Sequence, residues 1–128
     1  MIIKYSKFFE SKDKFPNIKE IKIDDFTVLI GKDANSNDYL TTIVANPEDI
    51  WMHAKGVPGS HVVIKVFDKL PEKSVIMQSA EIAAKNSKSK GSSTIVYCKA
   101  KFVTKKKDMK PGQVSVDYKN AEEITINI

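Results

Sequence analysis

The segment from Asp49 to Ile64, DIWMHAKGVPGSHVVI, carries the residue types in this sequence that are best suited to chemistry. Its first part has the pattern of a strand, in which side chains two residues apart share a face. Trp51, His53 and Lys55 are therefore expected to lie on one face. An aromatic ring can stack on a nucleic-acid base, and an ammonium group can pair with a phosphate. The pattern indicates a surface that contacts nucleotides.

The strand predicted at residues 61–67, which contains His61 and Lys65, is expected to return as the partner strand after a loop of about four to five residues. If Lys55 pairs with His61, Trp51 lies opposite Lys65 and a polar face is assembled. If the register slips by one residue, Trp51 lies opposite Ile64 and belongs to the core. The sequence leaves both registers open.

The same residues raise the question of a metal site or a catalytic site. A zinc site needs three or four ligands, whereas His53 and His61 are accompanied only by Cys98 and Asp49, without a recognisable ligand spacing. Ser60 follows a Pro-Gly turn, where its expected role is to bond the turn backbone. We therefore expect no metal, no cofactor and no catalytic residue.

The positive charge is concentrated in one part of the chain. Every basic residue is a lysine, and the whole sequence has a net charge of +5. Residues 85–110 contain nine lysines and one aspartate, a net charge of +8. This stretch is expected to attract a polyanion, with a solvated lysine-rich face as the alternative. Without arginine, contacts to the phosphate backbone are favoured over bidentate readout of guanine.

The lysines expected to contact a nucleic acid are Lys85, Lys88, Lys90, Lys105, Lys106 and Lys107. The last three form part of a lysine-rich turn and are expected to face solvent.

Length and composition are those of an ordinary globular protein. The 128 residues are 41% hydrophobic and 29% charged, which suits a single domain over residues 1–128. No run of about 18 apolar residues is present, so no membrane span is expected. The only cysteine, Cys98, allows no internal disulfide, which favours a reducing compartment such as the cytoplasm.

Most of the chain shows the period-two alternation of β-strands. Strands are predicted at residues 26–30, 40–45, 50–55, 61–67, 93–103 (with a bend near Ala100), 113–118 and 123–128. A helix is predicted to open at Pro71 and to continue over residues 74–87. We expect an α+β fold, a mainly antiparallel sheet with one main helix packed on it. A short second helix within residues 1–20 is also compatible with the pattern.

Four separated motifs, taken in order, resemble the NFACT-R module, the RNA-binding module of the NFACT family of ribosome-associated quality-control factors. The motifs are GKDANSNDYLT at residues 31–41, DIWMHAKGVPGSHVVI at 49–64, AEIAAKNSKSKGSS at 80–93 and KPGQVSV at 110–116. The pair formed by Trp-x-His-Ala and Pro-Gly-Ser-His-Val-Val is the most specific. The resemblance extends from about Lys22 to Ile128.

The resemblance implies RNA as the partner, either rRNA or tRNA, with the large ribosomal subunit as the setting. It implies a recognition patch formed by Lys32, Asn37, Asp38, Trp51, His53, Lys55, Ser60 and His61. Lys32 and Asp33 stand where long members of the family usually have Arg-Asn, which is more similar to short relatives that consist of this module alone. We therefore expect a stand-alone copy that binds RNA and does not itself direct the C-terminal tailing of stalled chains.

Two other functions fit the same residues. A protein-interaction adaptor would present the patch to an acidic protein. A nucleic-acid-processing enzyme would place His53 and His61 around one phosphate, but no acid in the local sequence would orient either imidazole. RNA binding without turnover is the function that the sequence favours.

Overall fold

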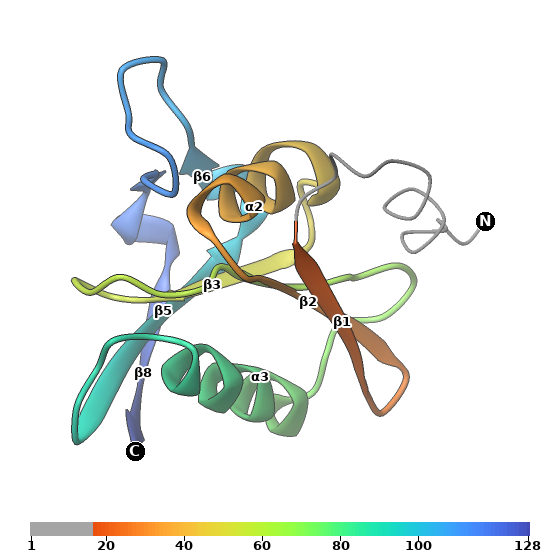
Figure 1. Ribbon diagram of the computed structural model, residues 1–128. Helices are drawn as coiled ribbons and strands as arrows, with labels where there is room; N and C mark the ends of the chain where they lie inside the picture. Colours follow the sequence, from red (N-terminus) through yellow and green to blue (C-terminus); the bar gives the residue numbers. More distant parts are fainter. Residues whose placement is uncertain (1–16) are drawn as a thin grey trace.

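A six-stranded antiparallel sheet forms the centre of the fold in the computed structural model, which describes residues 17–128 (Figure 1). The strands lie in the order β1-β2-β4-β3-β5-β8, and every neighbouring pair is antiparallel. Their bounds are β1 Ile18–Ile23, β2 Phe26–Gly31, β3 Ile50–Ala54, β4 Val62–Ile64, β5 Ser92–Lys99 and β8 Glu122–Asn127. The expected α+β class is confirmed.

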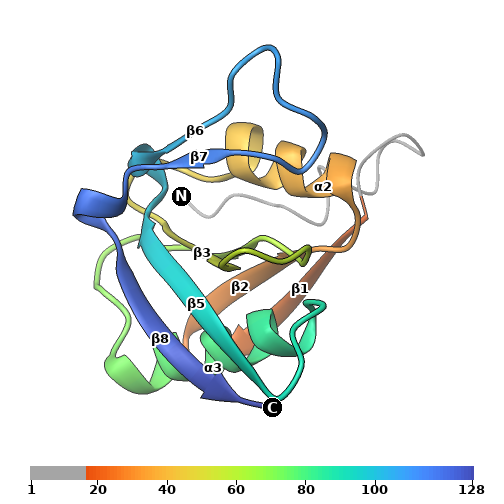
Figure 2. The same cartoon turned by 90° about the vertical axis from the view of Figure 1, so that its left-hand side faces the viewer.

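Two helices lie on opposite sides of this sheet, and a small hairpin accompanies it (Figures 1 and 2). The helical elements are α2 Ala34–Tyr39, the π-helical turn η1 Leu40–Val44, α3 Lys73–Lys85 and the 3₁₀ turns η2 Ala100–Phe102 and η3 Tyr118–Asn120. The hairpin consists of β6 Val103–Thr104 and β7 Ser115–Val116, which form a separate two-stranded sheet. Within residues 17–128 no helix has the length and apolar character needed to cross a bilayer.

The central strands are apolar on both faces because a layer of structure covers each face. On the α3 side, Val28, Met52 and Val62 belong to one continuous core. The helix approaches the sheet closely because the residues that it buries there include Ala80 and Ala83. The predicted main helix is confirmed.

The other face is covered by α2 and η1, which form one continuous helical segment (Figure 2). The strand predicted at residues 40–45 is therefore wrong. Asp33 begins the helix, because its carboxylate accepts a hydrogen bond from the Ser36 backbone N–H at 2.8 Å, an N-cap contact that satisfies a free donor of the first turn.

The core on this side explains why the β-branched run after α2 is helical. Leu40 and Val44 are buried against Leu29, Trp51 and Cys98 of the sheet. A helix places residues four positions apart on the same face, so both side chains reach the sheet. Tertiary packing of this kind outweighs the local strand propensity.

One ion pair is completely enclosed beside β3 and β4. The side chains of Asp49 and Lys65 contact each other, and both are 0% exposed. The Asp49 carboxylate also accepts backbone hydrogen bonds from Asn46 and Val66, each at 2.8 Å. Lys65 therefore does not contribute to a polar surface beside Trp51, as one predicted register would require.

The C-terminal third of the chain follows the predicted pattern with one change. β5 ends in the turn η2, which confirms the bend near Ala100. The strand predicted at 113–118 is reduced to β7 and is followed by η3. The loop between β6 and β7 extends past α2 (Figure 2). Most of the helix considered for residues 1–20 lies outside the described residues, and residues 18–20 belong to β1.

Candidate nucleic-acid interface

The pairing of β3 with β4 decides which side chains share a face. The structure pairs Trp51 with Val63, which is neither of the two predicted registers. Residues 55–61 form the connection, a longer loop than expected. The loop cannot continue the pairing because its backbone binds α3 instead: the Ser60 N–H donates to the Asn86 carbonyl at 2.9 Å.

The observed register keeps Trp51, His53 and His61 on one face, but that face lies beneath α2 and η1. Trp51 and His61 are each only 1% exposed. Of the two outcomes that the sequence left open for the tryptophan, the buried one is correct. Its indole ring packs with Leu40 and Val44 in the core.

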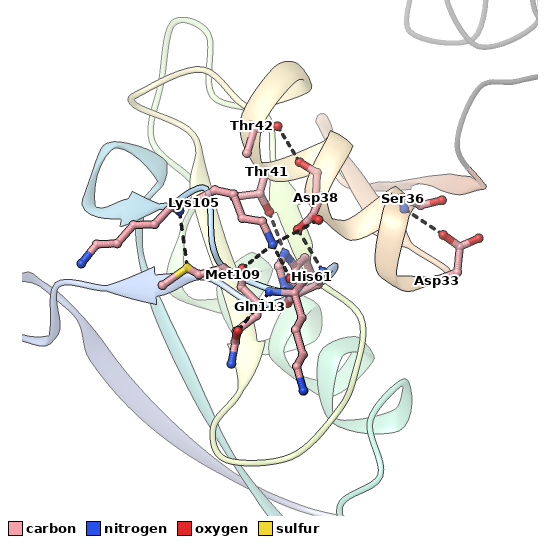
Figure 3. Close-up of polar contacts among 12 residues, drawn as sticks. Asp33, Ser36, Asp38, Thr41, Thr42, His61, Lys105, Met109 and Gln113 are labelled. Carbon is pink, nitrogen blue, oxygen red and sulfur yellow. Dashed lines mark hydrogen bonds and ion pairs between the residues drawn. The ribbon is translucent and has the colours of Figure 1, made fainter.

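A chain of hydrogen bonds runs through this buried region, and Figure 3 shows the part formed by Thr41 and His61. Trp51 Nε1 donates to Thr41 Oγ1 at 3.0 Å, and Thr41 Oγ1 lies 2.7 Å from His61 Nδ1. His61 Nε2 lies 3.1 Å from the Gly112 carbonyl oxygen. A carbonyl only accepts, so Nε2 carries the proton.

The tautomer of His61 then follows from its burial. Desolvation, with a smaller contribution from the neighbouring His53, lowers the pKa of His61 to about 3. A neutral imidazole with its proton on Nε2 accepts at Nδ1. The Thr41 hydroxyl therefore donates to His61 while accepting from Trp51.

Asn37 fastens α2 to the loop before β4. Its side-chain oxygen accepts from the His61 backbone N–H at 3.0 Å, and its amide nitrogen donates to the Gly59 carbonyl at 3.2 Å. The contact requires glycine at position 31, because a Cβ there would lie 2.1 Å from the Asn37 side-chain oxygen. Both polar ends of the Asn37 side chain are thus engaged within the protein.

Asp38 fastens α2 to the β6–β7 loop (Figure 3). Its carboxylate accepts from the Gly112 N–H at 3.0 Å and pairs with Lys105 Nζ at 3.2 Å. The Lys105 ammonium also donates to the backbone carbonyls of Lys110 and Gln113. The expectation that Lys105 faces solvent is wrong: its side chain is 19% exposed and holds the loop in place.

An open cleft of about 840 Å³ lies between the 55–61 loop, the end of α3, the start of α2 and the β6–β7 hairpin. The central sheet contributes Trp51, His53 and Val96 to its lining. Trp51 and Val96 are almost fully buried, while His53 is half-buried. The inner end of the cleft is therefore aromatic and aliphatic.

Two of the lysines along the cleft already have partners inside the protein. Lys32 Nζ donates to Asn86 Oδ1 at 2.9 Å. Lys55 Nζ pairs with Glu123 at 2.7 Å and lies 5.1 Å from the centre of the Tyr118 ring. Tyr118 also lines the cleft and is 53% exposed, so an accessible aromatic ring stands beside a cation.

Lys88 and Lys110 complete the cationic lining. Both side chains are exposed. In the part of the chain that the structure describes, neither ammonium group makes a hydrogen bond or an ion pair. These two charges are available to a ligand without breaking an internal contact.

His53 is the histidine that remains accessible. Burial is the main cause that lowers its pKa, although a hydrogen bond with the Gly59 backbone acts in the opposite direction. Its ring centre lies 5.1 Å from that of His61 and 6.0 Å from that of Trp51. Because both nitrogens of His61 are engaged, the two imidazoles do not form a pair of free proton carriers.

The structure separates the predicted recognition residues into two groups. The residues that line the cleft are Lys32, Asn37, Trp51, His53, Lys55, Ser60, His61 and Lys88. The residues outside its lining are Asp38, Lys85, Lys90, Lys105, Lys106 and Lys107.

The lysine-rich stretch 85–110 is likewise not one continuous surface. Lys99 and Lys101 both pair with Glu48, at 2.8 and 3.0 Å. Lys105 pairs with Asp38, so part of the charge counted along the sequence is neutralised within the fold.

Several residues of the site were not identified from the sequence. Thr41, Lys110, Gly112 and Tyr118 belong to the buried network or to the cleft. The sequence signal for three of them was present, since Thr41 lies in the GKDANSNDYLT motif and Lys110 and Gly112 lie in the KPGQVSV motif. The role of Thr41 was missed because residues 40–45 were interpreted as a strand.

Metal-binding and thiol chemistry find no support in the described residues. No group of three or more His, Cys, Asp or Glu side chains within residues 17–128 is placed to hold an ion. Burial, assisted by Asp117, raises the pKa of the Cys98 thiol to about 11. Cys98 is therefore protonated near neutral pH and belongs to the core.

Comparison with known protein families identifies the family of this chain. The sequence matches the family described as "NFACT protein RNA binding domain" over residues 8–118. The chain therefore belongs to this family of RNA-binding domains.

Its curated relatives are much longer proteins. The chain is 45% identical over 101 residues to the Rqc2 homolog RqcH of Bacillus subtilis (strain 168), and 41% identical over 91 residues to that of Streptococcus suis (strain 05ZYH33). The alignments cover 77% and 69% of this chain but only 17% and 16% of the relatives. The chain thus spans about one sixth of their length.

A solved structure shares the fold. It is the C-terminal part of the fibronectin/fibrinogen-binding protein from Streptococcus suis, with a TM-score of 0.77 and 32% sequence identity. The match covers 91% of this chain and 46% of that chain.

Proposed function

We propose that this protein binds rRNA or tRNA in the cytoplasm, in the setting of ribosome-associated quality control, and that it does so without catalytic turnover. The observation that carries the proposal is the cleft, in which an aromatic and aliphatic interior is bordered by Lys32, Lys55, Lys88 and Lys110. Membership of a family of RNA-binding domains supports RNA as the polyanion. Similarity to RqcH proteins supports the ribosomal setting, and we propose the large ribosomal subunit as the partner within it.

The charges favour recognition of the RNA backbone. Lysine offers a point charge rather than the planar fork of arginine, and phosphate contacts position a protein without reading sequence. Lys88 and Lys110 can contact phosphates at once, while Lys32 would exchange its bond to Asn86 for a phosphate oxygen. Lys106 and Lys107 are exposed on the adjoining loop and would extend the contact.

The histidines support binding rather than hydrolysis. General acid–base cleavage of RNA needs two groups that can exchange protons at one phosphate. His61 uses Nδ1 and Nε2 for Thr41 and Gly112, which leaves His53 alone. Incubating labelled tRNA and rRNA fragments with the wild type and with His53→Ala tests this directly. Specific cleavage that disappears in the variant would make the protein an enzyme.

The binding test measures affinity for tRNA and rRNA fragments by fluorescence anisotropy at several salt concentrations. Each phosphate contact contributes about 0.7–0.9 to the slope of log affinity against log salt. The double variant Lys88→Ala/Lys110→Ala should therefore bind more weakly and lower the slope by about 1.4–1.8.

A matched control removes two exposed lysines that do not line the cleft, Lys19 and Lys73. Lys19→Ala/Lys73→Ala has the same net charge as the cleft variant and should retain most of the affinity and the slope. Equal losses in the two variants would mean that the cleft has no special role. Crosslinking in cells followed by sequencing identifies the RNA, and recovery of an acidic protein without RNA would favour the adaptor function.

A further inference from the structure

We propose that the cleft receives the base of one unpaired nucleotide of the bound RNA strand, with the base beside His53 and the flanking phosphates on the lysine rim. This inference rests on the proposed function and specifies the form of RNA that the site accepts. The shape, the order of the chemical groups and the state of His53 carry the inference.

The shape favours a protruding group over a flat one. A volume of about 840 Å³ falls in the range of about 300–1,000 Å³ that is usual for small-molecule sites. The bases of a regular RNA duplex are stacked and paired, so a duplex presents only phosphates, sugars and groove edges. A duplex could contact the rim lysines but would leave the interior empty. An unpaired nucleotide can fill it.

From the interior to the rim, the side chains of the cleft match the parts of a nucleotide from its base to its phosphate. The inner lining contains His53 and the buried side chains of Trp51 and Val96, which suit a planar base. The ammonium groups of Lys88 and Lys110 have no partner in the described part of the chain, and they suit phosphate. A free phosphate group alone would leave the aromatic interior unused.

The protonation state of His53 favours a base over a phosphate at the inner end of the cleft. Desolvation lowers the pKa of His53, so its imidazole is neutral near pH 7. A neutral ring offers a face for stacking and does not attract an anion into the interior. Catalysis is not needed to explain an accessible neutral imidazole at this position.

The mouth of the cleft offers a second stacking surface. Tyr118 is 53% exposed, and the Lys55 ammonium lies 5.1 Å from its ring centre. Lys55 is already paired with Glu123 at 2.7 Å, and this carboxylate would repel a phosphate nearby. The phosphates are therefore directed toward Lys88 and Lys110, and Tyr118 can stack on a neighbouring base.

The test compares three RNAs of matched sequence and length: a single strand, a fully paired duplex, and the duplex with one bulged 2-aminopurine. Stacking on an aromatic side chain is worth about 5- to 150-fold in affinity per base. We expect the bulge to bind at least about fivefold more tightly than the paired duplex. The 2-aminopurine emission should change on binding, because the base moves into a new stacking environment.

Two substitutions of one residue separate stacking from charge. His53→Leu removes the planar ring and should abolish the preference for the bulged over the paired duplex. His53→Phe keeps a planar ring without the imidazole nitrogens and should retain the preference. Thermal unfolding checks that both variants fold. If either does not, Tyr118→Ala against Tyr118→Phe tests ring stacking at the exposed mouth of the cleft, where loss of the ring should weaken binding of the bulged duplex and the phenylalanine should retain it.

A free nucleotide has the same base and phosphate groups as a nucleotide in a strand. Measuring the affinity for adenosine monophosphate tests whether the cleft binds free nucleotides instead. Adenosine monophosphate lacks the neighbouring phosphates and should bind far more weakly than the single strand. Equal affinity would assign the cleft to free nucleotides and overturn the inference.

The remaining outcomes are distinct from one another. Equal affinity for the bulged and paired duplexes, or a His53→Leu variant that keeps the preference, would refute base insertion while leaving RNA binding intact. Failure to bind all three RNAs would instead refute the proposed function.

Discussion

The hydrogen bonds of Thr41 should be essential for stability, because one hydroxyl serves two buried partners. It accepts from Trp51 Nε1 at 3.0 Å and contacts His61 Nδ1 at 2.7 Å. The change Thr41→Val replaces the hydroxyl by a methyl group of similar size. It leaves the indole N–H and the Nδ1 lone pair without a partner, in a region where both side chains are 1% exposed.

The expected loss is large for a substitution that preserves shape. An unsatisfied buried polar group costs about 1–3 kcal/mol, so two such groups should lower the free energy of unfolding by about 2–6 kcal/mol. The control is Thr41→Ser, which keeps the hydroxyl and removes only the methyl group. Loss of one buried methyl costs about 1 kcal/mol. The valine variant should therefore be clearly less stable than the serine variant.

Urea unfolding measures the difference, with Trp51 emission and far-UV circular dichroism as independent probes. The slope of free energy against urea should be the same for all three proteins, since the surface exposed on unfolding is unchanged. In the wild type, the nitrogen resonances of His61 should show the proton on Nε2. A valine variant as stable as the serine variant, or a proton on Nδ1, would refute the hydrogen-bond assignment.

Three further outcomes follow from the same structure. The pKa of His61 is lowered from 6.5 to about 3, so the unfolded chain binds the proton more readily. The contribution of His61 to the free energy of unfolding is therefore fully present above pH 6.5 and is lost as the pH falls, by about 2 kcal/mol at pH 5. Unfolding curves at pH 5 and above pH 6.5 measure this loss, and His61→Gln should make stability depend less on pH. Changing Lys106 and Lys107 to alanine should lower the salt slope of RNA binding by up to about 1.8 without loss of stability. Lys105→Ala should instead lower the free energy of unfolding by about 1–2 kcal/mol. A destabilised Lys106/Lys107 variant beside a fully stable Lys105 variant would contradict the loop contacts. Asp49→Ala leaves a buried ammonium without its counter-ion and should cost about 3–5 kcal/mol, measured by urea unfolding, and a loss below 1 kcal/mol would show that the site admits water.

Local sequence was sufficient where the structure depends on neighbours along the chain. The alternation of residues 26–30 and 123–128 and the helical face of residues 74–87 identify β2, β8 and α3. Spacing places Trp51 and His53 on one face of β3, because strand geometry has a period of two. The four motifs also identify the family, which the match over residues 8–118 confirms.

Long-range contacts decided the rest. The β3–β4 register depends on the 55–61 loop binding the end of α3, and no residue within the hairpin signals that competition. The helical state of residues 40–44 depends on the sheet beneath them, since burial of Leu40 and Val44 opposes local strand propensity.

The accessible part of the site was settled by tertiary structure for the same reason. The sequence has nine lysines in residues 85–110, but Glu48 and Asp38 approach from distant segments and form ion pairs with three of them. Trp51 and His61 became structural because α2 covers them, while His53 stayed accessible at the base of the cleft. Residue type and period determined which side chains share a strand face; packing between distant segments determined which of them a ligand can reach.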